Sequence, residues 1–204
     1  DCMAIYTLNN PDTKIYTGKG LTLGGSHRIN NFSNDSLYGD LSAILLENSP
    51  TLVELIRTPP TKVALIEDFE EKMKKITEIT VNLNVTSISG VPSWFLVLLR
   101  YILKSTSKEN LYEIWPNLEV FFHGGINFSP YREQYRRILP GDRMNYMETY
   151  NASEGFFGIQ DDPSTSDMLL ILDSGVFYEF VRTDELENKN PKTLTIGEVE
   201  KGVN

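Results

Sequence analysis

The sequence is poor in cysteine and histidine, and this shortage argues against several kinds of site. Its 204 residues include one cysteine, Cys2, so no disulfide can form within the chain, as expected of a protein in the reducing cytoplasm. The two histidines, His27 and His123, stand far apart and have no cysteine cluster to join, which argues against zinc. No Ser-His-Asp or Cys-His arrangement can be nominated.

Phosphate-binding motifs and long apolar runs are also missing. The sequence contains neither the Walker loop G-x-x-x-x-G-K-S/T nor the dinucleotide motif G-x-G-x-x-G. Its most apolar stretch, residues 94–99, is followed by Arg100 and falls far short of the roughly 20 residues that span a bilayer. The net charge is −9 and no basic stripe is present. We therefore expect no membrane segment and no nucleic-acid partner.

The composition is that of a globular protein, with 40% hydrophobic and 23% charged residues. We expect residues 1–60 to form an irregular leading segment that packs on the main unit. Residues 61–204 are expected to form an α/β nucleotide-binding subdomain, the two parts together making a single incomplete domain. The oligomeric state cannot be read from this pattern.

Strand, small-residue turn and helix follow one another repeatedly along the chain. In the first unit, a β-branched run over residues 85–88 meets Ser89-Gly90, and Pro92 opens an apolar helix. In the second, a strand through residue 122 reaches Gly124-Gly125, and Ser129-Pro130 predict the next helix start. The third strand, near residues 145–150, ends in Asn-Ala-Ser-Glu-Gly. This repetition predicts α/β architecture.

Three other segments complete the predicted fold. Residues 37–60 read as two short helices split at Pro50, and residues 66–80 as a surface helix whose charged run is a solvated face. Residues 168–181 are two β runs around Asp-Ser-Gly, which indicate an antiparallel hairpin. The predicted fold class is α/β, with a mostly parallel sheet flanked by helices and a C-terminal antiparallel hairpin.

Ligands of open α/β sheets collect at the carboxyl ends of the strands, where this sequence has unusual residues. Tyr150 offers a flat face for stacking, Ser153 a hydroxyl for an oxyanion, and Glu154 a hard oxygen for Mg²⁺. Together they would suit a nucleotide. Spacing alone, however, favours ordinary turns and a helix N-cap followed by an acid. His123, beside Gly124, could touch a ligand, although a hydrogen-bonded strand-end histidine is the simpler interpretation.

Five segments, taken in order, carry a resemblance to a known family. They are GVPSWFLVLL at 90–99, WPNLEVFFHGG at 115–125, SPYREQY at 129–135, ETYNASEGFFGIQDDP at 148–163 and LLILDSGVFYEFV at 169–181. The chain resembles the auxin-responsive promoter (Gretchen Hagen) family of acyl-acid amido synthetases, and is most similar to the bacterial members. This family belongs to the adenylate-forming superfamily.

The resemblance implies roles for residues of the strand-end turns. Tyr150 matches the family's adenine-contacting tyrosine, Ser153 the hydroxyl that faces the α-phosphate, and Glu154 the magnesium-binding glutamate; Ser153 and Glu154 are the implied catalytic residues. The remaining residues implied to line the nucleotide site are Gly124, Gly125, Ile126, Asn151 and Ala152. The residues implied to line the acyl-acid pocket are Val91, Ser93, Trp94 and Leu98.

The family uses ATP and Mg²⁺ to activate a small carboxylic acid, and then joins the acyl group to an amino acid. Family members are longer than this chain. Their phosphate loop, a Tyr-Arg…Gly-Asp segment that binds ribose, and a mobile C-terminal domain find no match here. The resemblance therefore implies a central fragment of the large N-terminal domain, inactive when isolated because its phosphate-stabilising donors are incomplete. The alternative is a non-catalytic nucleotide- or acyl-binding regulatory module of the same fold.

Overall fold

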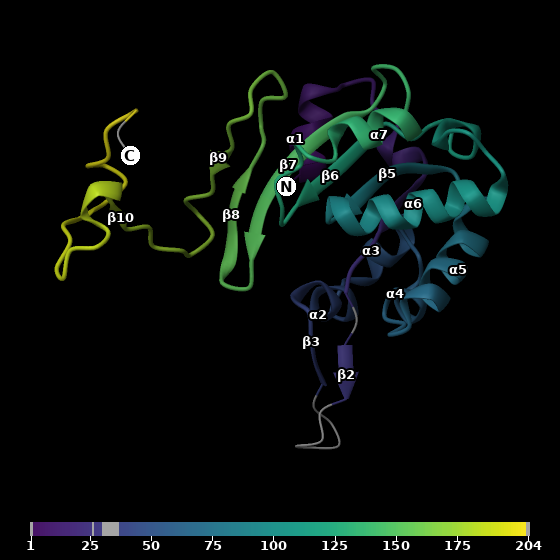
Figure 1. The fold of residues 1–204 in the computed structure, drawn as a ribbon, viewed down its shortest axis with the longest axis horizontal. Helices are drawn as coiled ribbons and strands as arrows, with labels where there is room; N and C mark the ends of the chain where they lie inside the picture. Colours follow the sequence, from purple (N-terminus) through teal and green to yellow (C-terminus); the bar gives the residue numbers. More distant parts are fainter. Residues whose placement is uncertain (1, 26, 30–36, 203–204) are drawn as a thin grey trace.

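The chain folds around a seven-stranded sheet, seen in a computed structural model that describes residues 2–25, 27–29 and 37–202 (Figure 1). The strand order is β4-β1-β5-β6-β7-β8-β9. The strands from β4 to β7 pair in parallel, whereas β8 and β9 are antiparallel. The strand bounds are β1 Lys19–Thr22, β4 Arg57–Thr58, β5 Val85–Gly90, β6 Val120–Gly124, β7 Asn145–Ala152, β8 Gly155–Ile159 and β9 Leu169–Leu170. The predicted α/β class with a mostly parallel sheet is confirmed.

Two of the predicted strand–turn–helix units form, and they differ in where the helix begins. Helix α6 (Pro92–Thr106) has Pro92 at its first turn, as predicted. Helix α7 (Arg132–Ile138) begins at Arg132, so the predicted start at Ser129-Pro130 is wrong. The Asn127 side chain instead accepts the Ser129 N–H at 2.8 Å, which holds these residues in a turn before the helix.

The third unit is a hairpin rather than a strand followed by a helix. Strand β7 turns back through Ser153-Glu154 into β8, with Ala152 opposite Gly155. The predicted pairing around Asp-Ser-Gly at 173–175 is also wrong in its position, because β9 pairs with β8. A C-terminal antiparallel hairpin does form, between β10 (Phe180–Val181) and β11 (Thr193–Leu194). Figure 1 shows this part of the chain extending away from the sheet.

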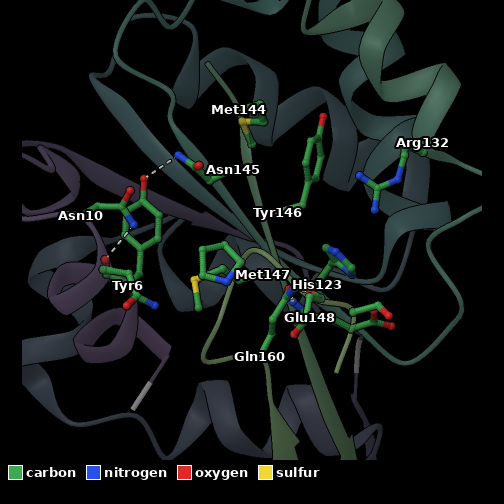
Figure 2. Close-up of a pocket in the computed structure, with 14 residues that line it drawn as sticks. Tyr6, Asn10, His123, Arg132, Met144, Asn145, Tyr146, Met147, Glu148 and Gln160 are labelled. Atoms are coloured by element: carbon green, nitrogen blue, oxygen red, sulfur yellow. Dashed lines mark hydrogen bonds between the residues drawn. The ribbon is translucent and has the colours of Figure 1, made fainter. Parts of the chain in front are cut away.

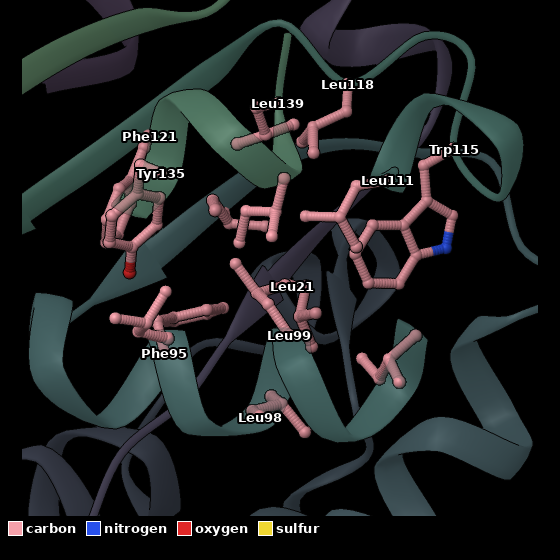
Figure 3. Packing of buried hydrophobic residues seen from close by; sticks show 14 of the residues in the cluster. Leu21, Phe95, Leu98, Leu99, Leu111, Trp115, Leu118, Phe121, Tyr135 and Leu139 are labelled. Atoms are coloured by element: carbon pink, nitrogen blue, oxygen red, sulfur yellow. The ribbon is translucent and has the colours of Figure 1, made fainter. Parts of the chain in front are cut away.

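The two faces of the sheet are covered unequally. Helices α5 (Phe69–Thr80), α6 and α7 pack on one face and bury the larger apolar cluster. In that cluster the ring of Phe121 lies 5.4 Å from Phe95 of α6 and 5.2 Å from Tyr135 of α7, centroid to centroid (Figure 3). On the other face, α1 (Cys2–Asn9) and η1 (Ile15–Thr17) cover Phe122 and its neighbours. Successive residues of β6 therefore point to opposite faces.

The remaining elements are short helices and strands outside the main sheet. Pro50 separates α2 from α3, which confirms the predicted pair of short helices. None of the helices in the described part of the chain is long and apolar enough to cross a membrane. The bounds of these elements are β2 His27–Ile29, β3 Leu37–Gly39, α2 Leu41–Glu47, α3 Thr51–Ile56, α4 Thr61–Ala64, η2 Leu111–Glu113 and η3 Thr183–Glu185. The side chain of His27 lies outside what the structure describes.

The strand order places a topological switch point beside β1. After β1 the chain forms β4 on one side of it, and then crosses to form β5 on the other. In open α/β sheets, the crevice at such a reversal, outside the carboxyl ends of the strands, is where ligands bind. The fold alone thus identifies the β1/β5 end as the place to look for a site.

Candidate active site

A cavity of about 740 Å³ lies at this switch point. It opens at the carboxyl ends of β1, β5, β6 and β7, and α2, α5 and α6 contribute further wall residues. The cavity is large enough for a drug-sized ligand. Its lining consists of Cys2, Thr22, Leu23, Gly24, Gly25, Asp40, Leu41, Ser42, Leu45, Glu67, Phe69, Lys72, Ser89, Gly90, Val91, Trp94, Phe122, Gly124, Gly125, Thr149, Asn151, Ala152, Ser153 and Phe156.

Glycines form part of the wall because the backbone has no room for a side chain. A Cβ on Gly124 would lie 2.3 Å from the Thr149 carbonyl oxygen of the neighbouring strand. Gly125 has a φ of +81°, a conformation that other residues adopt only with strain. Close packing thus accounts for Gly124, and backbone conformation accounts for Gly125. The same absence of side chains leaves main-chain atoms lining this part of the cavity.

The β7–β8 hairpin supplies the polar end of the cavity. Asn151, Ala152 and Ser153 line it, and an irregularity in the pairing between Tyr150 and Asn151 interrupts the alternation of the strand. Tyr150 itself is 54% exposed, with its ring 5.4 Å from that of Phe157 on the partner strand. Glu154 is exposed at the tip of the turn, just outside the cavity lining.

The structure brings together seven of the residues expected from the sequence and leaves others outside the cavity. The seven that line it are Val91, Trp94, Gly124, Gly125, Asn151, Ala152 and Ser153. Ser93 and Ile126 are half-buried beside it without lining it. Leu98 belongs to α6 and is fully buried in the core beneath the sheet-facing side of that helix. A larger share of the residues expected to bind the nucleotide lines the cavity than of those expected to bind the acyl group.

Lys72 is a site residue that sequence reasoning missed. It is only 3% exposed, and its Nζ lies 3.4 Å from the carbonyl oxygens of both Gly24 and Gly25. Burial lowers the pKa of this ammonium group, and the Asp40 carboxylate partly opposes that effect. The charged run of α5 conceals Lys72. The sequence did contain one signal that Lys72 is buried. It stands three residues after Phe69 and next to Met73, which places it on the apolar face of the helix.

His123 lies on the opposite face of β6 from this cavity. It is buried among aromatic rings, and its Nδ1 has no hydrogen-bond partner among the described residues. The interpretation of His123 as a hydrogen-bonded strand-end residue is therefore wrong for this nitrogen.

The Cys2 thiol does line the larger cavity, but burial raises its pKa, which keeps it protonated and unreactive.

Comparisons with known proteins agree with this architecture. No curated protein matches the chain significantly. A solved structure described as "GH3.15 acyl acid amido synthetase" is similar over 95% of this chain, with a TM-score of 0.60 and 15% sequence identity. At that identity the likeness shows the fold, and this chain spans 46% of the length of the matched chain. The family model described as "GH3 family N-terminal domain" matches residues 1–144. Because this match covers well over half of the chain, the chain belongs to the GH3 family.

Proposed function

We propose that this chain is the central part of an ATP-dependent acyl-acid amido synthetase of the bacterial type. The intact enzyme would use ATP to activate a small carboxylic acid as an acyl-adenylate, releasing pyrophosphate, and would then transfer the acyl group to the amine of an amino acid, releasing AMP. The observation that carries the proposal is the cavity at the β1/β5 switch point in a chain of this family.

The cavity has two chemically different ends, which fit two substrates. Its β7 end presents Asn151, Ser153 and the glycine wall of β6, which suit a nucleotide and its phosphates. Its other end combines apolar side chains, namely Leu23, Leu41, Leu45, Phe69 and Trp94, with the charged residues Asp40, Glu67 and Lys72. An apolar acyl group would be desolvated there, and its carboxylate would reach toward the α-phosphate.

Tyr150, Ser153 and Glu154 would act together on ATP. Tyr150 is exposed enough for an adenine ring to stack on it, and the Ser153 hydroxyl at the cavity wall would donate to the α-phosphate. Among the described residues no three His, Cys, Asp or Glu side chains gather into a metal cage. Glu154 would therefore share Mg²⁺ with phosphate oxygens and water, as is usual for this ion. Bound Mg²⁺ would neutralise charge on the departing pyrophosphate.

ATP–pyrophosphate exchange in the presence of a panel of carboxylic acids tests the proposal on the intact protein. We expect exchange that depends on the acid, and a loss of about 100-fold or more in Glu154→Gln. Glu133→Gln is the matched control, because Glu133 is exposed on α7 and pairs with Arg136 away from the cavity. We expect the isolated 204-residue chain to support no exchange.

Each other result has a definite meaning. Binding of Mg·ATP without exchange by any acid would favour a non-catalytic nucleotide-binding module of the same fold. Exchange that Glu154→Gln leaves unchanged would remove the metal role of Glu154 while retaining the enzyme. If the intact protein neither binds ATP nor supports exchange, the proposed function is wrong.

A further inference from the structure

The C-terminal segment, residues 160–202, has no core of its own. Ile159, at the end of β8, is the last buried residue of the described chain, and every described side chain after it is exposed or half-buried. The two β-favouring runs over residues 168–181 form strands only at Leu169–Leu170 and Phe180–Val181. Figure 1 shows the segment leaving the edge of the sheet and continuing away from it. Its apolar side chains therefore find no cover within the described structure.

Large apolar side chains face solvent along this segment. Phe177 is the most exposed of them, at 77%. Single exposed apolar residues are ordinary on protein surfaces, but seven in one segment that has no buried residue indicate a surface that a partner covers. The seven are Met168, Leu169, Leu172, Phe177, Leu186, Ile196 and Val199.

Strand β9 also has an open edge. It is the last strand of the seven-stranded sheet, and β8 pairs with one of its sides. The Ile171 N–H donates to the Phe157 carbonyl at 2.9 Å, but within the described structure no backbone N–H of residues 172–179 donates a hydrogen bond. An edge with unpaired main-chain groups and apolar side chains is a template on which an extended segment adds as a further strand.

The start of the C-terminal segment is attached to the sheet. Gln160 lies beside Glu148 of β7 (Figure 2). Its side chain accepts the Glu148 N–H at 3.1 Å and donates to the Thr165 carbonyl at 2.7 Å. The exposed run after it thus begins at a defined place on the sheet, where a partner can meet it in a fixed position.

A row of aromatic rings connects the C-terminal segment to the candidate active site. The ring of Tyr178 lies 6.3 Å from that of Phe157, which lies 5.4 Å from that of Tyr150, centroid to centroid. Val176 approaches the β7–β8 turn as well, since a Cβ on Gly155 would lie 3.4 Å from its side chain. A partner that fixes residues 176–178 would therefore also restrict the ring proposed to stack on adenine.

We infer that residues 168–181 are a docking edge for the remainder of the intact protein, which adds a β-strand with apolar side chains beside β9. The matched solved chain has ample further length to supply such a strand, since 95% of this chain matches 46% of that one. A second copy of this chain is a poorer occupant. Residues 161–202 carry ten acidic and four basic residues, so two such segments placed together would repel each other.

This inference rests on one part of the proposed function, namely that the chain belongs to a longer enzyme, and not on the adenylation chemistry. Hydrogen exchange of the intact protein, followed by mass spectrometry without ATP or acid, tests it. Without a partner strand, the amides of residues 172–179 should exchange at the rates of an unstructured chain, because they donate no hydrogen bond. With the docked strand, we expect about every second amide to exchange about 100-fold or more slowly.

Variants connect the slow exchange to the exposed apolar residues. Phe177→Ser should speed it about tenfold or more, because an apolar contact is lost. Tyr16→Ser changes an exposed aromatic residue of η1 and should leave it unchanged. Unstructured rates in the intact protein overturn the inference, and so does full protection in Phe177→Ser. Protection that disappears on dilution also overturns it, since a second copy would then be the occupant.

The result is separable from that of the ATP–pyrophosphate assay. An intact protein that protects residues 172–179 but supports no pyrophosphate exchange retains the docking edge and loses the proposed function. An intact protein that supports pyrophosphate exchange with these amides unprotected retains the proposed function and loses the docking edge.

Discussion

Tyr135 of α7 donates its hydroxyl hydrogen to the backbone carbonyl of Pro92, at 2.8 Å, across the core. Pro92 is the first residue of α6, and both Val91, just before it, and Trp94, two residues after it, line the larger cavity. This buried hydrogen bond therefore ties a helix packed in the core to the rim of the candidate site. Burial raises the pKa of the Tyr135 hydroxyl well above its usual range, so it is a donor at every accessible pH.

Removing this hydroxyl should destabilise the fold by a measurable amount. Tyr135→Phe keeps the ring that packs on Phe121 and loses only the hydrogen bond. We expect a loss of about 0.5–1.5 kcal/mol in the free energy of unfolding, measured by urea denaturation. Tyr16→Phe is the control, because Tyr16 is 57% exposed and should change stability by less than about 0.5 kcal/mol. Equal losses in the two variants would contradict the role given to this bond.

Gly124 should not tolerate alanine, because β6 and β7 would have to separate to make room. The new Cβ would lie 2.3 Å from the Thr149 carbonyl oxygen and 2.8 Å from its hydroxyl oxygen. We expect Gly124→Ala to cost about 2 kcal/mol or more in unfolding free energy and to weaken ATP binding to the intact protein. In Gly141→Ala no atom lies within 4 Å of the new Cβ, so only the strain of a positive φ, about 1 kcal/mol, should appear. A Gly124→Ala variant as stable as Gly141→Ala would show that the strands can move.

Short-range sequence signals predict a helix start correctly only where neighbouring residues alone determine it. Pro92 fixes the start of α6, since a first-turn residue needs no internal N–H bond, and the sequence showed this directly. The same reasoning failed at Ser129-Pro130, where the side chain of Asn127 stabilises a turn instead. Propensity cannot distinguish these two outcomes, because they depend on which nearby donor and acceptor meet.

Long-range pairing decided what the sequence could not predict. Ser153-Glu154 reads as a helix cap, yet residues 155–159 pair with β7 and make the same dipeptide a hairpin turn. Lys72 shows the corresponding limit for the site. Its charge fits a solvated helix face, and only the approach of Gly24 and Gly25 from β1 shows that it is buried. Ser153, by contrast, was predicted from its position at a strand end, and Asn151 from the family resemblance; both line the cavity.

Lys72 should determine which acids the proposed amido synthetase accepts. Its two contacts with the carbonyl oxygens of Gly24 and Gly25, each at 3.4 Å, are long for hydrogen bonds, so the ammonium can still take a ligand oxygen. We expect Lys72→Met to lower kcat/KM in ATP–pyrophosphate exchange roughly tenfold or more for acids that carry a second oxygen acceptor. Purely apolar acids should be nearly unaffected, and so should the exposed control Lys75→Met on the same helix. A uniform loss over all acids would instead indicate a structural role.

His123 should make the stability of the protein depend on pH below neutrality. Burial, with the nearby Arg132 cation as a second cause, lowers its pKa from 6.5 to about 4. Between these values the unfolded chain binds a proton that the folded chain does not, so stability falls as the pH falls. At about 1.4 kcal/mol for each pKa unit, the loss attributable to His123 approaches about 3 kcal/mol at pH 4. Above pH 6.5 both states are neutral and this residue contributes no dependence.

The variant His123→Phe isolates this contribution from the carboxylates, which also titrate in acid. Phenylalanine keeps a ring against Phe128 and removes both the titration and the unpaired Nδ1. Urea denaturation at intervals from pH 7 to pH 4 should show the variant gaining on the unmodified protein as the pH falls. At pH 7 the variant should already be more stable by about 1 kcal/mol or more, because a buried unsatisfied nitrogen is gone. A difference between the two proteins that stays constant over this range would mean that His123 keeps its ordinary pKa in the folded state.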